Sequence, residues 1–283
     1  MKIINGKEVS QKIKDELKSQ TEDLLSQGIV PCLAVIIVGN DPASRVYVNN
    51  KKKACEYIGF KSLEYALSEN TSENELLELI SSLNNNDEID GILCQLPLPK
   101  HINEKNVIDS ILPEKDVDAF HPQNVGRIMI GDYHVLPCTP AGVMELIKSE
   151  NIPLEGKNAV VLGRSNIVGK PMAMLLLQSN ATVTVCHSKT QNLKEICKTA
   201  DVLVSAIGKA KFVTEDMIKQ GAVVIDVGIN RDENGKLCGD VDFENVSKKA
   251  SFITPVPGGC GPMTISMLMK NTYNAAVKRR KTN

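Results

Sequence analysis

The stretch AVVLGRSNIVG, residues 159–169, decides the fold. Its four leading apolar residues predict a strand, and helical sequence follows the turn from about Pro171. Such a strand, glycine turn and helix start direct free backbone N–H groups and the positive end of the helix dipole at a phosphate. The spacing departs from Gly-x-Gly-x-x-Gly, because Ser165 replaces the second glycine and Gly169 comes one position late. The stretch predicts a Rossmann-like domain; tight strand-to-helix packing without a ligand is the competing interpretation of its glycines.

Outward from this stretch, strands and helices alternate along both halves of the chain. Strands are predicted at 33–38, 89–95, 159–162, 182–186, 202–207, 223–227 and 252–254. Helices are predicted at 7–26, from near Ser44, and after Ser72, where Glu75 completes a capping box. The segment around Pro137 and Pro140 is predicted to be a loop. The alternation predicts two α/β domains, the C-terminal one a Rossmann-like doubly wound parallel sheet, with the active site in the interdomain cleft.

The bulk composition predicts a soluble, cytoplasmic protein that acts on a small molecule. Of 283 residues 42% are apolar, and 33 Lys and Arg nearly balance 34 Asp and Glu, so neither nucleic acid nor a membrane is an expected partner. The eight cysteines are scattered and no apolar signal core follows Met1, which predicts reduced thiols. No metal site is expected. The basic segment 278–281 is interpreted as a frayed helix end without function.

The residues after the strand at 182–186 favour NADP over NAD. NAD-preferring Rossmann domains place an acid there to bind the ribose hydroxyls. Here the strand is followed by HSKT, residues 187–190, which offers the hydroxyl of Ser188 and the cation of Lys189 but no acid. Arg164 in the glycine turn adds a planar, bidentate phosphate ligand. For either cation alone, a solvated surface charge is the competing interpretation.

In the first half of the chain, Tyr47 and Lys51 lie one turn apart on a helix face that continues through apolar residues. A lysine on an inward face is partly desolvated, which brings its pKa toward the range useful for proton transfer. A lysine that snorkels to solvent is the alternative, and helical phase alone favours it. Gln95 follows a buried strand at the edge where parallel sheets bind ligands, and its neutral amide suits the orientation of a water or of the lysine.

Two further segments are candidates for a ligand site. KDVD, residues 115–118, carries two acids that cannot both be buried without partners. One of them is therefore expected to meet a donor-rich ligand edge, unless both are solvated. TPVPGGCGPMT, residues 254–264, combines three prolines and three glycines before a helix, and it suits either a wall of a ligand site or an architectural turn.

Five segments in this order resemble the bifunctional methylenetetrahydrofolate dehydrogenase/cyclohydrolase family. They are YVNNK at 47–51, QLPLP at 95–99, KDVD at 115–118, GRS with a later VG at 163–169, and PVPGG at 255–259. The resemblance spans nearly the whole chain and implies an N-terminal catalytic domain, 1–138, completed by the last helix, 267–283, and an NADP-binding domain, 139–266. The implied reactions are the oxidation of 5,10-methylenetetrahydrofolate with NADP and the hydrolysis of the methenyl product to 10-formyltetrahydrofolate. A homodimer is implied as well.

The resemblance also implies roles for single residues. Lys51 is the catalytic lysine, Gln95 its polar partner, Tyr47 the ring that orients or stacks on folate, and Asp118 the acid that holds the pterin. The implied nucleotide contacts are Gly163, Arg164, Ser165, Ser188 and Ile229. The implied folate contacts are Tyr47, Lys51, Gln95, Leu96, Asp118, Pro257, Gly258 and Gly259.

Two residues depart from the family's usual pattern. Ala119 stands where glycine is usual, so a positive φ there would cost about 1 kcal/mol and disturb Asp118 and pterin affinity. Cys260 stands where valine is common and adds a site of possible oxidation.

Two alternative functions use the same fold. One is an NADP-dependent dehydrogenase of another small substrate, such as a shikimate-type enzyme, which needs a different lysine and acid pair. The other is an NADP-binding sensor or scaffold without chemistry, which has no need of a semi-buried lysine.

Overall fold

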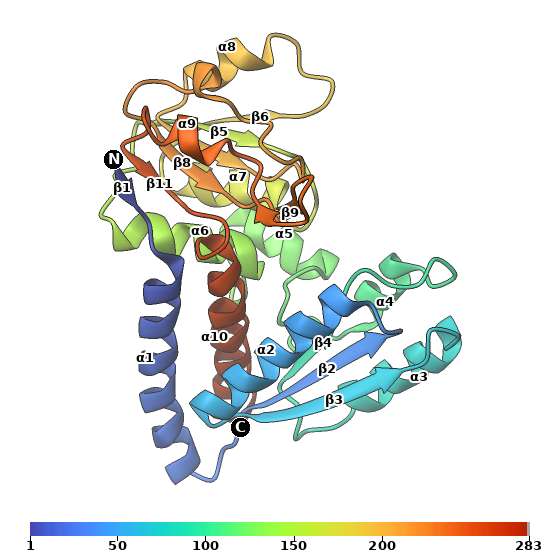
Figure 1. Cartoon of the computed structure of the whole chain (residues 1–283). Coiled ribbons are helices and arrows are strands. Elements are labelled where there is room, and N and C mark those ends of the chain that lie inside the picture. The colour runs from blue at the N-terminus through green and yellow to red at the C-terminus, as the bar shows by residue number, and fades with distance from the viewer. Residues whose placement is uncertain (282–283) are drawn as a thin grey trace. The chain divides into compact units, whose positions relative to one another are not determined.

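The computed structural model describes residues 1–281, which form two compact units (Figure 1). The large-sheet unit comprises Met1–Ser10 and Thr139–Thr264 and contains a six-stranded sheet; the small-sheet unit comprises Gln11–Cys138 and 265–281 and contains a three-stranded sheet. The first ten residues lie with the large-sheet unit because β1 (Lys2–Ile3) pairs in parallel with β11 (Phe252–Ile253). The predicted fold class, two α/β units with parallel sheets, is confirmed.

The small sheet has the strand order β3-β2-β4 and is parallel throughout. Its central strand, β2 (Cys32–Val38), is buried along its whole length, as expected of a strand covered on both faces. β4 (Gly91–Cys94) is a predicted strand too. β3 (Lys61–Leu67) is not among the predicted strands, because charged and partly exposed residues interrupt its apolar ones.

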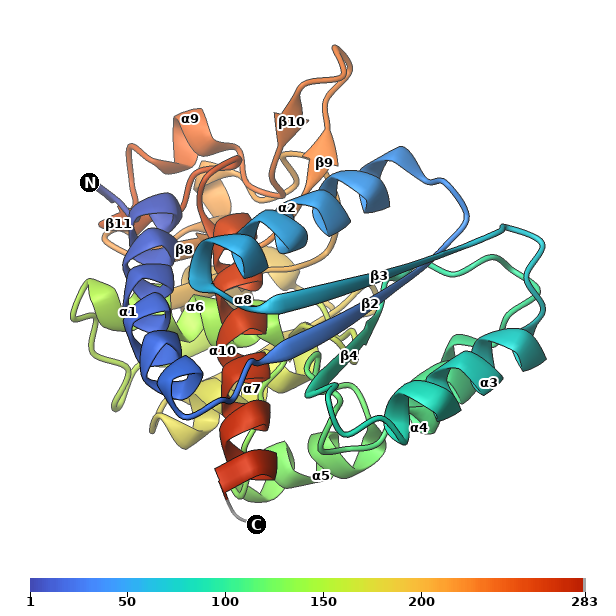
Figure 2. The ribbon, with the colours of Figure 1, turned by 90° about the horizontal axis from the view of Figure 1, so that it is seen from below.

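Helices cover both faces of the small sheet: α2 lies on one face, and α3 and α4 lie on the other (Figure 2). The helical elements with residues in this unit are α1 (Gly6–Ser26), α2 (Pro42–Ile58), α3 (Glu73–Asn84), α4 (Glu104–Ser110), α5 (Pro122–Ile130) and α10 (Cys260–Lys281). The predicted capping box is confirmed, since Ser72 Oγ accepts from Glu75 N and Glu75 Oε2 accepts from Ser72 N. α2 begins before Ser44, because the side chain of Asp41 accepts from Ser44 N and caps the helix there.

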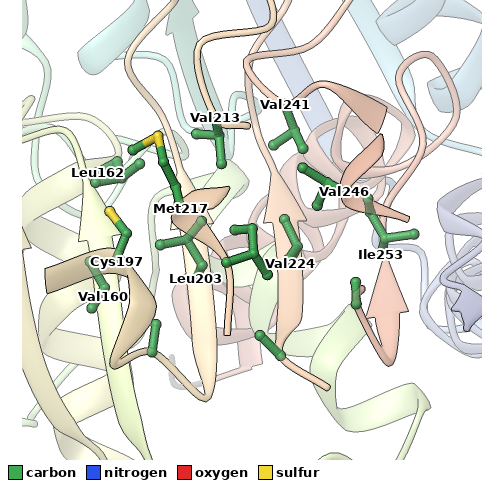
Figure 3. Close-up of a cluster of buried hydrophobic side chains, with 14 of the residues drawn as sticks. Val160, Leu162, Cys197, Leu203, Val213, Met217, Val224, Val241, Val246 and Ile253 are labelled. Atoms are coloured by element: carbon green, nitrogen blue, oxygen red, sulfur yellow. The ribbon is translucent and has the colours of Figure 1, made fainter. Parts of the chain in front are cut away.

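The large sheet has the strand order β1-β11-β8-β7-β5-β6, and all of its pairings are parallel. The longer strands are β5 (Asn158–Leu162), β6 (Thr182–Cys186), β7 (Val202–Ser205) and β8 (Val223–Asp226). All four were predicted. An apolar cluster on one face, including Val160, Leu203 and Val224, packs against residues of the covering segments such as Met217 and Val246 (Figure 3).

The remaining elements of the large-sheet unit are short connections apart from two helices. They are α6 (Cys138–Ser149), α7 (Gly169–Gln178), α8 (Leu193–Lys198), a 3-10 turn (Glu215–Met217), α9 (Phe243–Val246) and the antiparallel pair β9 (Asn230–Arg231) and β10 (Leu237–Cys238). The loop predicted around Pro140 is wrong, because α6 starts at Cys138. Pro140 is its third residue, where the missing N–H has no partner within the helix in any case.

The interpretation of the basic C-terminal segment as a frayed end is also wrong for two of its residues. Asp90 is fully buried, and its Oδ1 accepts from Arg280 Nε at 2.8 Å and from Arg279 Nη1 at 3.2 Å. These ion pairs hold the end of α10 against the start of β4. None of the helices within residues 1–281 is long and apolar enough to cross a membrane.

Candidate active site

Lys51 is buried on the inner face of α2, with only 8% of its surface exposed. Its Nζ donates to Gln95 Oε1 at 2.8 Å. Burial lowers the pKa of Lys51, and the charges of Asp118 and Cys138 oppose that shift. The apolar residues on the same helix face are buried with it: Val48, Ala54, Cys55 and Ile58. The predicted desolvation is confirmed, and the snorkelling alternative is wrong.

Gln95 presents a neutral oxygen to this amine. Its backbone N–H donates to Ile36 O at 2.8 Å, which fixes the residue at the carboxyl end of β4. Its Nε2 donates to Leu96 O at 2.7 Å, so Oε1 is the atom left to face Lys51. A neutral acceptor stabilises an ammonium group less than a carboxylate does, so Gln95 holds the lysine in place without fixing its proton.

Asp118 supplies the acid of this cluster. Burial raises its pKa to about 6; the charge of Lys51 opposes the rise and Asp116 adds to it. The Cys138 thiol donates to Asp118 Oδ1 at 3.8 Å. An amine and a carboxyl are thus electrostatically coupled in one place, each held toward its neutral form by burial.

Asp116 has a different role, although it lies only two residues earlier. Its Oδ2 accepts from His121 N at 2.8 Å and from Asn124 Nδ2 at 2.9 Å, and Asn124 also donates to Pro113 O. These donors come from the chain itself, so Asp116 is a structural acid. Of the two acids in the segment, Asp118 is the one left for a ligand.

Tyr47 and Leu96 are both half-buried, and Leu96 directly follows Gln95 in the sequence. Tyr47 lies one turn before Lys51 on α2, and burial raises the pKa of its phenol, which therefore stays neutral. Leu96 packs against the apolar cluster of the small sheet. Their contacts with a folate stay predictions.

The two departures from the family pattern have different consequences. Ala119 has a φ of 59° and is fully buried, so the condition under which alanine costs about 1 kcal/mol is met. Cys260 is buried as well, and that burial raises the pKa of its thiol far above the usual range. A buried thiol that stays protonated is inert, which contradicts the expected oxidation sensitivity.

In the large-sheet unit, the glycine turn after β5 is shaped by backbone packing. A Cβ on Gly163, whose φ is 115°, would lie 2.4 Å from Ala206 O, and one on Gly169 would lie 2.3 Å from Gly163 O. Ser165 Oγ accepts from Val168 N at 3.2 Å and from Gly169 N at 3.3 Å. The helix starts at Gly169 rather than Pro171, with Val168 at the N-cap position, and the Ser165 hydroxyl holds the turn just before it. The packing interpretation of the glycines is sufficient to explain them, so they do not by themselves identify a nucleotide site.

The surroundings of this turn fit a phosphorylated dinucleotide. β5 and β6 are paired in register from Asn158 to Leu162, so the turn containing Arg164 and the segment 187–190 follow adjacent strands at the same edge of the sheet. Arg164, Ser188 and Lys189 are all exposed, and no acid lies in 187–190. Ile229, which follows β8, is 52% exposed. Donors without an acid suit a 2′-phosphate better than free ribose hydroxyls.

Asp240 organises the loops at this edge and was not identified from the sequence. Its side chain is fully buried and accepts five hydrogen bonds, from Ser205 Oγ, Ile207 N, Gly208 N, Lys209 N and Asn230 Nδ2. These bonds draw the chain out of the ladder, which is why β7 ends at Ser205 and not at the predicted Ile207. A lone acid among polar loop residues gives no sequence signal for such a role.

Pro257, Gly258 and Gly259 lie in the large-sheet unit, where a structural role is visible. A Cβ on Gly6 at the start of α1 would lie 1.9 Å from Gly259 O, so the backbones of the two segments are in direct contact. Gly258 has a φ of 109°, a conformation that favours glycine. The architectural interpretation is thus supported, and contact with folate stays a prediction.

None of the predicted site residues lines the most clearly defined cavity of the large-sheet unit. It measures about 240 Å³ and is lined by the first residues of three strands, Val202, Val223 and Phe252. Ligands of open parallel sheets bind at the opposite, carboxyl ends of the strands. Asp118 borders a crevice of about 10 Å³. Cavity size therefore does not indicate the candidate site, which is defined here by the chemistry of its side chains.

Sequence reasoning missed two residues of the Asp118 cluster, Cys138 and Asn271. Cys138 lies in the segment that was predicted to be a loop. Asn271 is 6% exposed and lies on α10 among buried apolar residues, including Met267, Leu268 and Ala275. A single amide on such a face is the signal that would have identified it.

Comparisons with known proteins agree with this geometry. Residues 4–118 match the family model for the tetrahydrofolate dehydrogenase/cyclohydrolase catalytic domain, and residues 137–280 match the model for the NAD(P)-binding domain. The bifunctional protein FolD of Acetivibrio thermocellus is 68% identical over 275 residues, which cover 97% of this chain and 96% of the relative.

Two solved structures extend the likeness to three dimensions. The bifunctional FolD methylenetetrahydrofolate dehydrogenase/cyclohydrolase of Campylobacter jejuni has a TM-score of 0.97 at 55% identity and covers 99% of each chain. The Trypanosoma brucei methylenetetrahydrofolate dehydrogenase-cyclohydrolase, solved with NADP and an inhibitor, has a TM-score of 0.94 at 40% identity and covers 98% of this chain and 97% of that one.

Proposed function

This chain belongs to the tetrahydrofolate dehydrogenase/cyclohydrolase family, and we propose that Lys51, Gln95 and Asp118 carry its two reactions. The enzyme oxidises 5,10-methylenetetrahydrofolate to the 5,10-methenyl form with NADP+ and then hydrolyses that product to 10-formyltetrahydrofolate. The observation that supports the residue assignment is the buried Lys51 amine, whose hydrogen bond goes to a neutral amide at 2.8 Å. Membership of this family also removes the shikimate-type and sensor alternatives.

Each residue has a task that follows from its surroundings. Gln95 Oε1 orients the Lys51 amine, and the lowered pKa lets that amine exchange a proton with water that adds to the methenyl carbon. Asp118 accepts hydrogen bonds from donors of the pterin. Tyr47 offers a neutral ring face, and Leu96 an apolar edge, to the same substrate.

For the cofactor, the exposed groups at the carboxyl edge of β5 and β6 are the proposed ligands. Arg164 and Ser188 bind the 2′-phosphate, with Lys189 beside Ser188, and the backbone of Gly163 and Ser165 borders the diphosphate. Ile229 contacts the nucleotide through its exposed side chain. When bound, NADP+ supplies the acceptor for the hydride that leaves the methylene carbon, a step that needs no general base.

Four further assignments complete the proposal. The folate-binding domain is 1–138 with 267–283, and the NADP-binding domain is 139–266. The compact units differ from these bounds, because Met1–Ser10 lies with the large-sheet unit and 265–266 with the small-sheet unit. Pro257, Gly258 and Gly259 border the folate. The enzyme acts in the cytoplasm.

The last assignment is that the enzyme is a homodimer. The edge strand β6 suits self-association because Val185 on it is 38% exposed and Leu177 of α7 is 53% exposed. Light scattering during size-exclusion chromatography tests the dimer; a mass near 30.9 kDa at micromolar concentration would contradict it.

A single absorbance trace tests the two activities. Purified enzyme is mixed with methylenetetrahydrofolate and NADP+, and methenyltetrahydrofolate absorbance is followed. We expect a rise, then a decay faster than in buffer, with the decay lost in Lys51→Ala. Binding of NADP+ without either phase would refute the proposal.

Cofactor preference is tested by the Arg164→Ala variant. Removal of the guanidinium should lower kcat/KM for NADP+ and leave kcat/KM for NAD+ nearly unchanged. The ratio of the NADP+ value to the NAD+ value should therefore fall. Glu155→Ala, an exposed change outside the predicted site, is the matched control. An unchanged ratio in Arg164→Ala would remove this residue from the phosphate site.

A further inference from the structure

Asn271 of α10 joins the two backbone segments that carry Asp118 and Cys138. Its Nδ2 donates to Val117 O at 2.8 Å and to Leu136 O at 2.8 Å, so both amide hydrogens are used. Val117 directly precedes Asp118, and Leu136 lies two residues before Cys138. The amide is buried, at 6% exposure, so water does not compete for these bonds.

Cys138 closes the same arrangement from the other side. Its thiol lies 3.6 Å from Val117 O and 3.8 Å from Asp118 Oδ1, and Asn271 Nδ2 lies 3.7 Å from the sulfur. Burial and the nearby carboxyl raise the pKa of Cys138, so the thiol stays protonated and acts as a donor.

The backbone around Asp118 is therefore held on both sides. On the preceding side, the Val117 carbonyl receives the Asn271 amide and the Cys138 thiol. On the following side, Ala119 takes the left-handed conformation and its N–H donates to Asp116 O at 3.3 Å. The positive φ of Ala119 is energetically unfavourable. The geometry of this turn therefore depends on the hydrogen bonds that hold the backbone on either side of Asp118.

We infer that Asn271 and Cys138 are positioning residues that fix the Asp118 carboxyl beside Lys51 for folate binding. The inference rests on the proposed function for what Asp118 binds, and on these contacts alone for where Asp118 is held. It gives the C-terminal helix a part in the catalytic cluster besides packing.

Kinetic constants distinguish the positioning of Asp118 from a general contribution of Asn271 to the folded structure. Asn271→Leu keeps the branched shape and the number of heavy atoms and removes both donors, and Asn274→Ala, an exposed change on the same helix, is the control. We expect the KM for methylenetetrahydrofolate to rise about tenfold in Asn271→Leu, because a small misplacement of a binding group is costly. The kcat and the KM for NADP+ should stay within about twofold.

A titration of Asp118 tests the inference without turnover. The titratable groups that face Asp118 are Lys51 of α2, Asp116 of its own segment, Cys94 of β4 and Cys138. The thiol stabilises the ionised carboxyl, so Cys138→Ala should raise the pKa of Asp118 above its present value of about 6, and Cys138→Ser, which keeps a donor, should restore it. Carbon NMR of labelled aspartate reads this value in folded protein.

The outcomes are distinct. A rise in folate KM alone, with an Asp118 pKa that responds to alanine but not to serine, supports the inference. An unchanged folate KM in Asn271→Leu overturns it. A general defect, in which kcat falls and the KM values for folate and NADP+ rise together, also overturns it. If Asn271→Leu does not fold, the two Cys138 variants decide. Absence of turnover in the wild type refutes the proposed function instead, and the titration still tests the position of Asp118.

Discussion

Lys51 and Lys115 are both buried lysines of the small-sheet unit, and their partners differ. Lys115 is 1% exposed, and its Nζ donates to Leu83 O, Asn84 O and Asn86 O at the C-terminal end of α3. All three of its hydrogens are used. Lys51 donates to Gln95 Oε1. Burial lowers the pKa of both lysines, that of Lys115 to about 8.

The difference teaches how burial and function are related here. A lysine whose three N–H groups all donate to carbonyls at a helix end caps that helix. It has no N–H group left to donate to a substrate. A cation with one neutral partner keeps donors for a substrate or water. The acids of the segment 115–118 repeat the pattern, since Asp116 is bonded within the chain and Asp118 is bonded to a weak thiol donor.

The largest effect that this comparison predicts is the loss of hydrolysis in Lys51→Met. Proton transfer by a positioned side chain contributes about 100- to 10,000-fold to a rate, so kcat for methenyltetrahydrofolate hydrolysis should fall by at least about 100-fold. The free energy of unfolding should be unchanged or higher, because a desolvated charge is removed. Hydrolysis is followed by absorbance and stability by urea denaturation. Retention of more than a tenth of the wild-type kcat would break the comparison.

Lys115→Met should have the converse effect. Three carbonyls lose their charged donor, so the free energy of unfolding should fall by about 2 kcal/mol. The kcat of the folded protein should remain near that of the wild type. Urea denaturation and assays at the same temperature measure both quantities. A stable variant that has lost activity would mean that Lys115, too, serves the reaction.

Much of this fold followed from the sequence, for identifiable reasons. The apolar runs of β2, β5, β7 and β8 are continuous because helices or loops cover both faces of their sheets, and such runs are readable. β3 and α6 were missed because the first carries charges and the second starts with Cys138 and Pro140, which look like a turn. Lys51, Gln95 and Asp118 were predicted as site residues from helical phase, strand ends and a family resemblance. Cys138, Asn271 and Asp240 were not, since their roles depend on contacts between segments far apart in the sequence.

A smaller effect is expected from pH. Burial raises the pKa of Asp118 to about 6, so the carboxyl becomes protonated as the pH falls through 6, where an ordinary aspartate stays ionised. The KM for methylenetetrahydrofolate should rise about tenfold for each pH unit below 6, since the ionised acceptor is lost. Initial rates from pH 5 to 8 measure this limb. It should be absent in Asp118→Asn, and its persistence there would assign the titration to another group.

The smallest effect is expected at Ala119. Glycine relieves the cost of the positive φ, but it removes a buried methyl group and adds freedom to the unfolded chain. Ala119→Gly should therefore change the free energy of unfolding by less than about 1 kcal/mol, with folate KM within about twofold. Thermal unfolding and steady-state kinetics check both values. A KM that falls by tenfold would show that alanine displaces Asp118.

The most direct test of the account is an NMR titration of the lysine amines in protein labelled at the lysine Cε. We predict that the resonances of Lys51 and Lys115, identified by their loss in Lys51→Met and in Lys115→Met, titrate with midpoints below the ordinary 10.5. Added folate analogue should shift the Lys51 resonance and leave the Lys115 resonance in place. A Lys51 amine that titrates at 10.5 or above, or that ignores the analogue, would contradict the claim that its spare hydrogen-bonding capacity serves the substrate.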